Sequence, residues 1–499
     1  MQVDWFLDSG ERPVTTDNEV RPLIEGATYY AELLAEVRRL RKGDLLLFTD
    51  WRGDPDERLD GPGTEVATVF SEAAQRGVIV KGLVWRSHWD RLAFSAAENR
   101  HLGDRIEAAG GECLRDMRVR SGGSHHQKFV VLRHPGRPAL DVAYVGGIDL
   151  CHSRRDDSEH LGDPQPMTMS PQYGERPPWH DVQVAIRGPA VGDVETTFRE
   201  RWTDPTPLSR NPVYRLQDLL EREDTTPDPL PDQLPDPPPA GEHAVQLLRT
   251  YPYRRRGYPF APLGERSVAR GYCKAAARAR RLIYIEDQYL WSPEAVACFA
   301  DALRNRPELR LIAVVPRYPD QPGKIGGIPQ LLGRARAVDD LRDAGGDRFA
   351  IYSPENRAGT PVYVHAKVCV IDDEWATVGS DNVSLRSWTH DSELTCAVVD
   401  PSGAYARDLR TRLGMEHLQL DSPAPLLDPA AAFAAFAVSA AALQTWHDGG
   451  RKGERPRGRL RPFAPTAIDG WTRRWSSLLY RSIFDPDGRP SRIRGTDTF

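Results

Sequence analysis

The chain carries the same order of parts twice, on either side of a proline-rich stretch. In each copy a helical pattern leads into an apolar strand with a polar end, and a His-x-Lys sequence follows later. From Asp50 to His126 there are 76 positions, and from Glu286 to His365 there are 79. A repeat of this length and order predicts two halves of similar structure, each with its own helices and strands.

The periodicity of apolar residues predicts which elements each half contains. One segment has apolar residues at the spacing of a helix, and the next two are short apolar runs typical of buried strands. Helices that alternate with such strands predict an α/β fold of two similar sandwich halves, each a mixed β-sheet flanked by helices. These segments are 27–40, 45–51 and 78–85 in the first half, and 267–280, 282–288 and 311–315 in the second.

Changes of composition along the chain predict the domain boundaries. Prolines are so dense in residues 225–241 that neither a helix nor a central strand can form there, which indicates a semi-stiff linker. The expected organisation is a first repeat (1–202), a proline-rich linker (203–243), a second repeat (244–424), and a C-terminal helix with a tail (425–499).

The longest apolar run, residues 430–443, predicts a helix near the C-terminus. Asp428 and Pro429 in front of it are a typical N-cap and first helical residue. The run is shorter than the roughly 20 residues that cross a bilayer. We therefore expect a buried, alanine-rich helix, and any membrane contact is expected to be peripheral.

The composition limits the expected partners and location. Of the 499 residues, 40% are hydrophobic and 27% charged, and the net charge of -5 gives no overall attraction to nucleic acid. The N-terminus lacks the basic start and apolar core of a signal peptide, and six cysteines without a Cys-x-x-Cys pair predict reduced thiols. A cytoplasmic protein is expected, and the net charge disfavours a nucleic-acid partner without excluding one. His88, His152, His160 and His390 lack the spacing of metal ligands.

The second half contains residues suited to phosphate chemistry. His365 and Lys367 are two positions apart on a predicted strand, so both side chains address the same ligand. An imidazole can attack phosphorus or protonate an ester oxygen, while an ammonium neutralises phosphate oxygens. Further along, Gly379 and Ser380 allow a close backbone approach, and Asn382 adds a neutral donor.

The spacing of these residues is His-x-Lys, four residues, Asp372, six residues, and Gly-Ser. At every position it resembles the His-Lys-Asp motif of the phospholipase D superfamily. Other segments are similar to eukaryotic-type phospholipases D and to cardiolipin synthase-like proteins, and the likeness extends over most of residues 20–415. These segments are 146–150, 155–157, 178–181, 283–289 and 385–387.

The first half departs from the family pattern at one position. After His126 and Lys128 the motif's aspartate is expected at position 133, where this chain has Arg133. The following segment, 133–140, indicates an enlarged hairpin turn. Asp141 is a candidate substitute, although its spacing does not establish that role. In the family this aspartate is regarded as mostly structural, so the resemblance does not imply a loss of activity.

The resemblance implies one active site at the interface of the two halves, with a pseudo-two-fold axis between them. It assigns His126 as the nucleophile that attacks phosphorus and His365 as the general acid that protonates the leaving oxygen. Lys128 and Lys367 would hold the phosphate oxygens as charge develops. Water or another alcohol would then reverse the sequence and release the phosphoryl group.

Each histidine needs an orienting partner that fixes its tautomer. By resemblance, Asp181 serves His126 and Glu393 serves His365, with Asp391 as a nearby competitor for the second role. No metal or other cofactor is expected. The predicted site comprises catalytic His126, Lys128, His365, Lys367, Asp372, Asp181 and Glu393, and substrate-binding Gly147, Asp149, Ser380, Asn382, Glu286 and Gln288.

The function implied is cleavage or transfer of a phospholipid phosphodiester through a covalent phosphohistidine intermediate. One alternative is a nuclease or general phosphodiesterase of the same superfamily. Another is a member that binds phosphates or membranes without catalysis, which the altered first motif suggests and the two intact His-x-Lys motifs oppose. The expected partner is a phospholipid or other phosphodiester.

Overall fold

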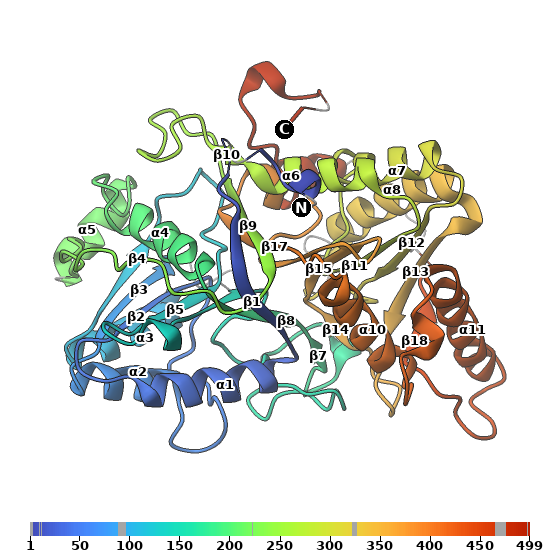
Figure 1. Cartoon of the computed structure of the whole chain (residues 1–499), viewed down its shortest axis with the longest axis horizontal. Coiled ribbons are helices and arrows are strands. Elements are labelled where there is room, and N and C mark those ends of the chain that lie inside the picture. Colours follow the sequence, from blue (N-terminus) through green and yellow to red (C-terminus); the bar gives the residue numbers. More distant parts are fainter. Residues whose placement is uncertain are drawn as a thin grey trace.

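The computed structural model of the chain contains two halves that lie side by side (Figure 1). Strands β1 (Thr15–Ile24) and β9 (His243–Tyr251) lie between them and pair in antiparallel fashion. The predicted α/β fold of two similar halves is confirmed. One of the histidines discussed above, His88, lies outside the described residues. The structure describes residues 3–499 except 9, 11, 88–95, 222, 322–326, 465–475 and 497.

The strands of both halves follow the same order within one continuous sheet. In the first half the order is β1, β8 (Val182–Arg187), β6 (Val142–Gly146), β5 (Phe129–Arg133), β2 (Leu45–Asp50), β3 (Ile79–Trp85) and β4 (Glu112–Asp116). In the second half it is β9, β17 (Glu393–Val399), β16 (Trp375–Gly379), β15 (Lys367–Ile371), β11 (Leu282–Asp287), β12 (Arg310–Val314) and β13 (Phe349–Pro354). In each half the last three strands are parallel and the others antiparallel.

Helices cover both faces of the sheet in each half. The strands carry apolar side chains on both faces, and the helices on either side bury nearly every strand residue. In the first half the helices are α1 (Gly26–Arg39), α2 (Val66–Gln75) and α3 (Ala96–Ala108) on one face and α4 (Ala190–Trp202) on the other. In the second half they are α6 (Ser267–Arg278), α7 (Pro293–Asn305) and α8 (Gly327–Gly345) on one face and α10 (Ala404–Leu418) on the other.

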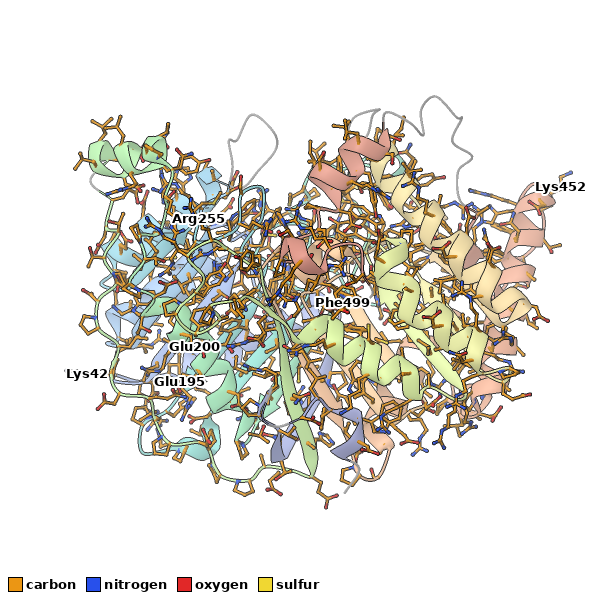
Figure 2. All side chains as sticks on the ribbon, turned by 90° about the horizontal axis from the view of Figure 1, so that it is seen from above. Lys42, Glu195, Glu200, Arg255, Lys452 and Phe499 are labelled. Carbon is orange, nitrogen blue, oxygen red and sulfur yellow. The ribbon has the colours of Figure 1, made fainter. Side chains whose placement is uncertain are left out.

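The two sets of helices are arranged as an approximate two-fold axis requires. In Figure 1, α1 and α2 lie below the sheet of the first half, whereas α6 and α7 lie above that of the second. The helices α4 and α10 show the opposite arrangement: α4 lies above the sheet of the first half and α10 below that of the second. Both contribute to a single apolar core that the two halves share. Figure 2 shows the same two halves from above, with Lys42 and Lys452 at opposite ends of the molecule.

The proline-rich segment between the halves packs along the first half. It is preceded by a helix, α5 (Pro212–Glu221), which lies inside the range predicted as linker. Residues 225–240 have no helix or strand, and their carbonyl groups accept hydrogen bonds from buried side chains of the first half. The Trp202 indole donates to the Asp228 carbonyl (2.9 Å), and the Arg133 guanidinium donates to the Pro235 carbonyl (2.5 Å).

The C-terminal helix α11 (Pro429–Asp448) begins where predicted, and the Asp428 carboxylate caps the amides of Ala430 and Ala431. The expectation that it is buried is wrong, because only one stripe of side chains packs against the sheet. Alanine exposes little apolar area, so such a face costs little in water. Within the part of the chain described, α11 is the one helix whose length and composition would suffice to cross a membrane. The buried stripe consists of Pro429, Ala432, Phe436, Ala440 and Leu443.

Candidate active site

Each His-x-Lys motif is bound through its backbone to the other half of the chain. The first motif directly precedes β5, and the second ends on the first residue of β15. The amide of His126 donates to the carbonyl of Ser392 (3.0 Å), and the amide of His365 donates to the carbonyl of His180 (2.8 Å). The two motifs are therefore held at the seam between the halves, in equivalent positions.

The same pairing brings each histidine to a carboxylate of the other half. Nδ1 of His126 lies 2.9 Å from Oε2 of Glu393, and Nδ1 of His365 lies 2.7 Å from Oδ2 of Asp181. The predicted assignment, with Asp181 on His126 and Glu393 on His365, is wrong. Glu393 directly follows Ser392, and Asp181 directly follows His180, whose carbonyl groups accept the amides of His126 and His365. These backbone contacts between the halves therefore bring each carboxylate to the histidine of the other half.

The surroundings of His126 keep its imidazole neutral. Burial, together with the Lys128 and Lys367 ammonium groups, lowers the pKa of His126 well below its usual value. Glu393 lies on the Nδ1 side and accepts a further hydrogen bond from the Ser380 hydroxyl (2.5 Å). Burial and the negative charge of Asp391 raise the pKa of Glu393 to about 8. Ser380 thus positions the carboxyl partner of His126.

The surroundings of His365 are similar in kind but contain more cations. Burial, Lys367 and Arg154 lower the pKa of His365 well below its usual value. The Trp179 ring packs on the imidazole with ring centres 5.0 Å apart. Gly147 permits the approach of Asp181, because a Cβ at this position would lie 2.3 Å from its Oδ1. Gly147 therefore provides space for the orienting carboxylate.

Two buried lysines supply positive charge to both histidines, and an arginine adds to it at His365. Lys128 and Lys367 are each 1% exposed, and each donates to the carbonyl of the histidine in its own motif. Burial lowers the pKa of Lys367 to about 8. The third cation, Arg154, was not predicted as a site residue. Its guanidinium lies 4.0 Å from the centre of the Trp179 ring, in a cation–π contact that only the folded chain reveals.

Two of the predicted substrate-binding residues, Asp149 and Gln288, lie beside these cations. Asp149 lies 3.6 Å from Lys128 and 3.6 Å from Arg154; burial acts to raise the pKa of Asp149, but the two cations outweigh it and lower that pKa. The Gln288 side chain accepts from the Lys367 ammonium (3.2 Å). The Oδ1 atom of Asn382 is buried and has no protein partner, so it is free to contact a ligand.

Asp372 does not lie with the other predicted catalytic residues. Its carboxylate accepts hydrogen bonds from the backbone amides of Arg280, Arg281 and Leu282 at 2.7–2.9 Å, where β11 begins. It therefore follows the end of β15 that is opposite to Lys367. Asp372 ties two neighbouring strands together at that end and does not contact the histidines.

Glu286 also lies outside the candidate site. The structure aligns Asp50 with Asp287, because each accepts the amide of an equivalent loop residue at 2.8 Å, Leu150 or Val383. The matching spacing in the second half therefore starts at Asp287, 78 positions before His365. A shift of one residue turns a strand side chain to the other face, so Glu286 points away from the lysines.

The altered first motif has a defined structure. Arg133 is fully buried and forms ion pairs with Asp141 (2.8 Å) and with Glu195 of α4, which Figure 2 labels in the first half. Asp141 also accepts the amide of His134 (2.6 Å). Asp141 thus serves as the counterion of Arg133, at the end of β5 that is opposite to the first motif.

Two family models match successive parts of the chain. The model described as "Phospholipase D" matches residues 61–250, and the model described as "Cardiolipin synthase, PLD-like domain" matches residues 273–413. Each matched range contains one of the two His-x-Lys motifs. The chain belongs to the phospholipase D superfamily.

The related proteins are distant in sequence. Phospholipase D alpha 1 of Cynara cardunculus is 26% identical over 73% of this chain and 60% of its own length. Phospholipase D beta 1 of Arabidopsis thaliana is 27% identical over 57% of this chain and 35% of its own length. The chain thus spans between about a third and three fifths of these curated relatives.

One solved structure has a fold similar to that of this chain. Phosphatidylserine synthase of Haemophilus influenzae Rd KW20 superposes with a TM-score of 0.54 at 15% identity. The superposition covers 82% of this chain and 86% of that one. It supports the two-half architecture over most of the length.

Proposed function

We propose that the chain is a phospholipase D-type phosphodiesterase that cleaves a phospholipid, or transfers its phosphatidyl group, through a phosphohistidine intermediate. One observation carries the proposal: two His-x-Lys motifs meet at the seam of the halves, and each histidine has a buried carboxylate on Nδ1. A carboxylate at Nδ1 leaves Nε2 of each imidazole to exchange protons or bonds with a substrate.

The first step is an attack of His126 on phosphorus. Its depressed pKa leaves a lone pair on the imidazole at neutral pH. A bond forms between nitrogen and phosphorus while the ester bond to the headgroup oxygen breaks. Lys128 and Lys367 neutralise the charge that builds on the non-bridging oxygens, and both are preorganised by burial.

His365 supplies the proton that the leaving oxygen needs. Burial and the surrounding cations depress its pKa in the free protein, but a phosphodiester anion beside Lys367 adds negative charge and favours the imidazolium. Asp181 stabilises that imidazolium through Nδ1. In the second step the neutral His365 takes a proton from water or another alcohol, which attacks phosphorus and releases His126.

The decisive test is product analysis with mixed phospholipid vesicles, ethanol and a chelator. Wild-type protein is expected to form phosphatidylethanol, whereas His126→Asn and His365→Asn are not. A phosphoprotein trapped with labelled lipid, stable in base and labile in acid, would identify the phosphohistidine. Cleavage of single-stranded DNA without any lipid product would redirect the assignment to a nuclease, and silence toward every diester would overturn it.

A further inference from the structure

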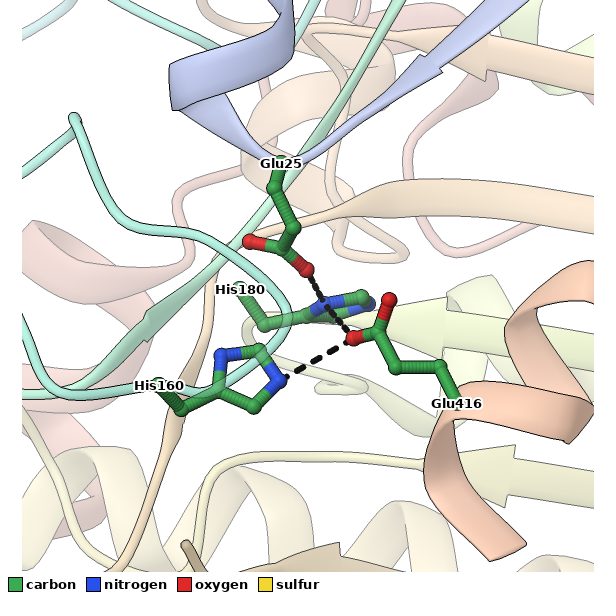
Figure 3. A group of neighbouring side chains, drawn as sticks. All are labelled: Glu25, His160, His180 and Glu416. Carbon is green, nitrogen blue, oxygen red and sulfur yellow. Dashed lines mark hydrogen bonds and ion pairs between the residues drawn. The ribbon is translucent and has the colours of Figure 1, made fainter. Parts of the chain in front are cut away.

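Two histidines and two glutamates converge at one point in the interior of the protein (Figure 3). Glu25 follows β1, His160 lies in the loop after β6, and His180 ends the short strand β7 (Trp179–His180). Glu416 comes from α10 of the second half. We call these four residues the His–Glu cluster.

The four side chains present one donor atom each to a common point. Nε2 of His160 lies 3.0 Å from Oε1 of Glu416, and Nδ1 of His180 lies 3.4 Å from the same oxygen. Glu25 also contacts Nδ1 of His180, and all four donor atoms lie within 4.8 Å of one another. Three of the residues are buried, and the Glu416 side chain is 11% exposed.

The outer contacts of both histidines match those of metal ligands. A ligating histidine almost always donates its second ring N–H to a carboxylate or a backbone carbonyl. Nδ1 of His160 lies 2.9 Å from the carbonyl oxygen of Trp179, and Nε2 of His180 lies 2.6 Å from a Glu286 oxygen. Glu286 is itself bound by His417 (2.7 Å). When each ring donates its outer N–H in this way and loses its other proton to a metal ion, the nitrogens that face the two glutamates carry the lone pairs that bind the ion.

The cluster also contains a polar atom without a partner. Oε2 of Glu25 is buried and lacks a hydrogen bond, which is costly for a carboxylate unless a cation is near. The backbone of Glu25 adopts φ 71° and ψ 144°, and that of His160 has a φ of 53°. Such conformations cost free energy in residues other than glycine, and they tend to persist where a site requires them.

We propose that Glu25, His160, His180 and Glu416 bind one divalent transition-metal ion, with zinc as the best fit. Two imidazoles and two carboxylates are a ligand set that zinc accepts in tetrahedral geometry. The two negative charges of the glutamates balance the charge of the ion, so the buried site is neutral. With four protein ligands and no open position, the ion is structural.

The site would connect the two halves next to the candidate active site. Glu416 is contributed by the second half and the other three ligands by the first. His180 is followed directly by Asp181, which orients His365, and its carbonyl oxygen accepts the His365 amide. Loss of the ion is therefore expected to disturb the general acid before it disturbs the nucleophile.

The first experiment is elemental analysis of the full-length protein, without an affinity tag that binds metals, purified from zinc-supplemented cells. We expect about one zinc per chain. Cobalt substitution should add the visible absorption bands of a tetrahedral Co²⁺ site. Less than about one ion per ten chains, together with no binding of added Zn²⁺ or Co²⁺, would overturn the proposal and leave a network of protonated histidines.

Variants locate the ion. His160→Asn and Glu416→Gln should lose it, whereas His126→Asn should retain it, which separates the cluster from the candidate active site. His447→Asn is the matched control, because His447 also faces a buried carboxylate, Glu355 at 2.8 Å, outside the cluster. Metal that is retained by both cluster variants would contradict the assignment. If those variants do not fold, the cobalt spectrum of the wild type still decides.

Discussion

The two halves of the chain place opposite charges at the same point of an otherwise repeated fold. In the second half Asp372 binds three backbone amides at the start of β11. In the first half Arg133 occupies that point, where it pairs with Asp141 and Glu195 and donates to the Pro235 carbonyl. Both side chains lie at the end of the strand remote from the His-x-Lys motif. The comparison indicates that this motif position serves architecture, and that the chemistry resides in the rest of the motif.

A second comparison concerns the two histidine–carboxylate pairs. The His126–Glu393 pair has Asp391 beside it, which contributes to the raised pKa of Glu393. The His365–Asp181 pair has Arg154 and the Trp179 ring beside it. Equivalent positions in the repeat thus have different electrostatic surroundings, as two roles in one reaction require.

The largest expected effect separates the two histidines by leaving group. Under the proposed mechanism, His126→Asn removes the nucleophile, and activity should fall by roughly 10⁴-fold with any substrate. His365→Asn removes the proton donor, so it should be equally inactive on a lipid but still release one burst of p-nitrophenolate from a phosphatidyl p-nitrophenyl ester, whose leaving group needs no proton; turnover after the burst stays slow because the same residue activates the attacking water. A burst from His126→Asn instead would exchange the two roles.

The exchanged carboxylates can be tested in the same way. Asp181→Asn should lower kcat on a lipid by about 10²- to 10³-fold and have little effect on the rate of the p-nitrophenolate burst, because it acts through His365, whose proton the first step needs only for a poor leaving group. Glu393→Gln should lower both rates in parallel, because it acts through the nucleophile. Equal responses of the two variants would contradict the pairing between the halves. Asp301→Asn, in a surface ion pair with Arg304, is the control.

The sequence was sufficient for the fold and for most of the candidate site. Helical and strand periodicity predicted the elements, because apolar side chains must follow the buried faces. The two His-x-Lys motifs and Gln288 were likewise identified, because the two motifs have fixed local spacing and Gln288 lies in a short segment with a strong family resemblance. These features depend on residues that are close together in the chain.

The partners of the histidines could not be predicted from such local patterns. Which carboxylate reaches which imidazole is decided by backbone contacts between the halves, such as that of Ser392 with His126. Arg154 is positioned by the fold of a long loop, and Glu286 was misplaced by a register error of one residue. The exposure of α11 was missed because alanine is compatible with both a core and a surface.

Stability measurements sharpen the comparison of Arg133 with Asp372. Arg133→Met removes the guanidinium that pairs with buried Asp141 and Glu195 and leaves Glu195 with Arg199 alone, so we expect the free energy of unfolding to fall by about 3–5 kcal/mol. Asp372→Asn removes part of a cap and should cost about 1–2 kcal/mol. Urea unfolding measures both changes, and kcat of the folded fraction should stay within a few-fold of wild type. A selective collapse of kcat in Asp372→Asn would restore a catalytic role.

The pH dependence offers the finest test of the difference between the two pairs. Because the pKa of Glu393 is raised to about 8, the His126–Glu393 pair keeps an additional proton below that pH, and kcat/KM should rise as the pH increases through it. Lys367, whose pKa is lowered to about 8, loses its charge over the same range, so kcat/KM should fall again and give a narrow maximum.

Substitution of Asp391 should widen that maximum on one side only. Asp391→Asn removes the negative charge that raises the pKa of Glu393, so the rising limb is expected to move to lower pH by about one unit. The falling limb, set by Lys367, should stay in place, because the cation that determines it is unchanged. The position of each limb is compared, not its height, since an asparagine side chain keeps only one of the two Asp391 oxygens that accept from Ser124 and Arg386. A rising limb that does not move, or that moves to higher pH, would show that Glu393 does not control the protonation of the nucleophile.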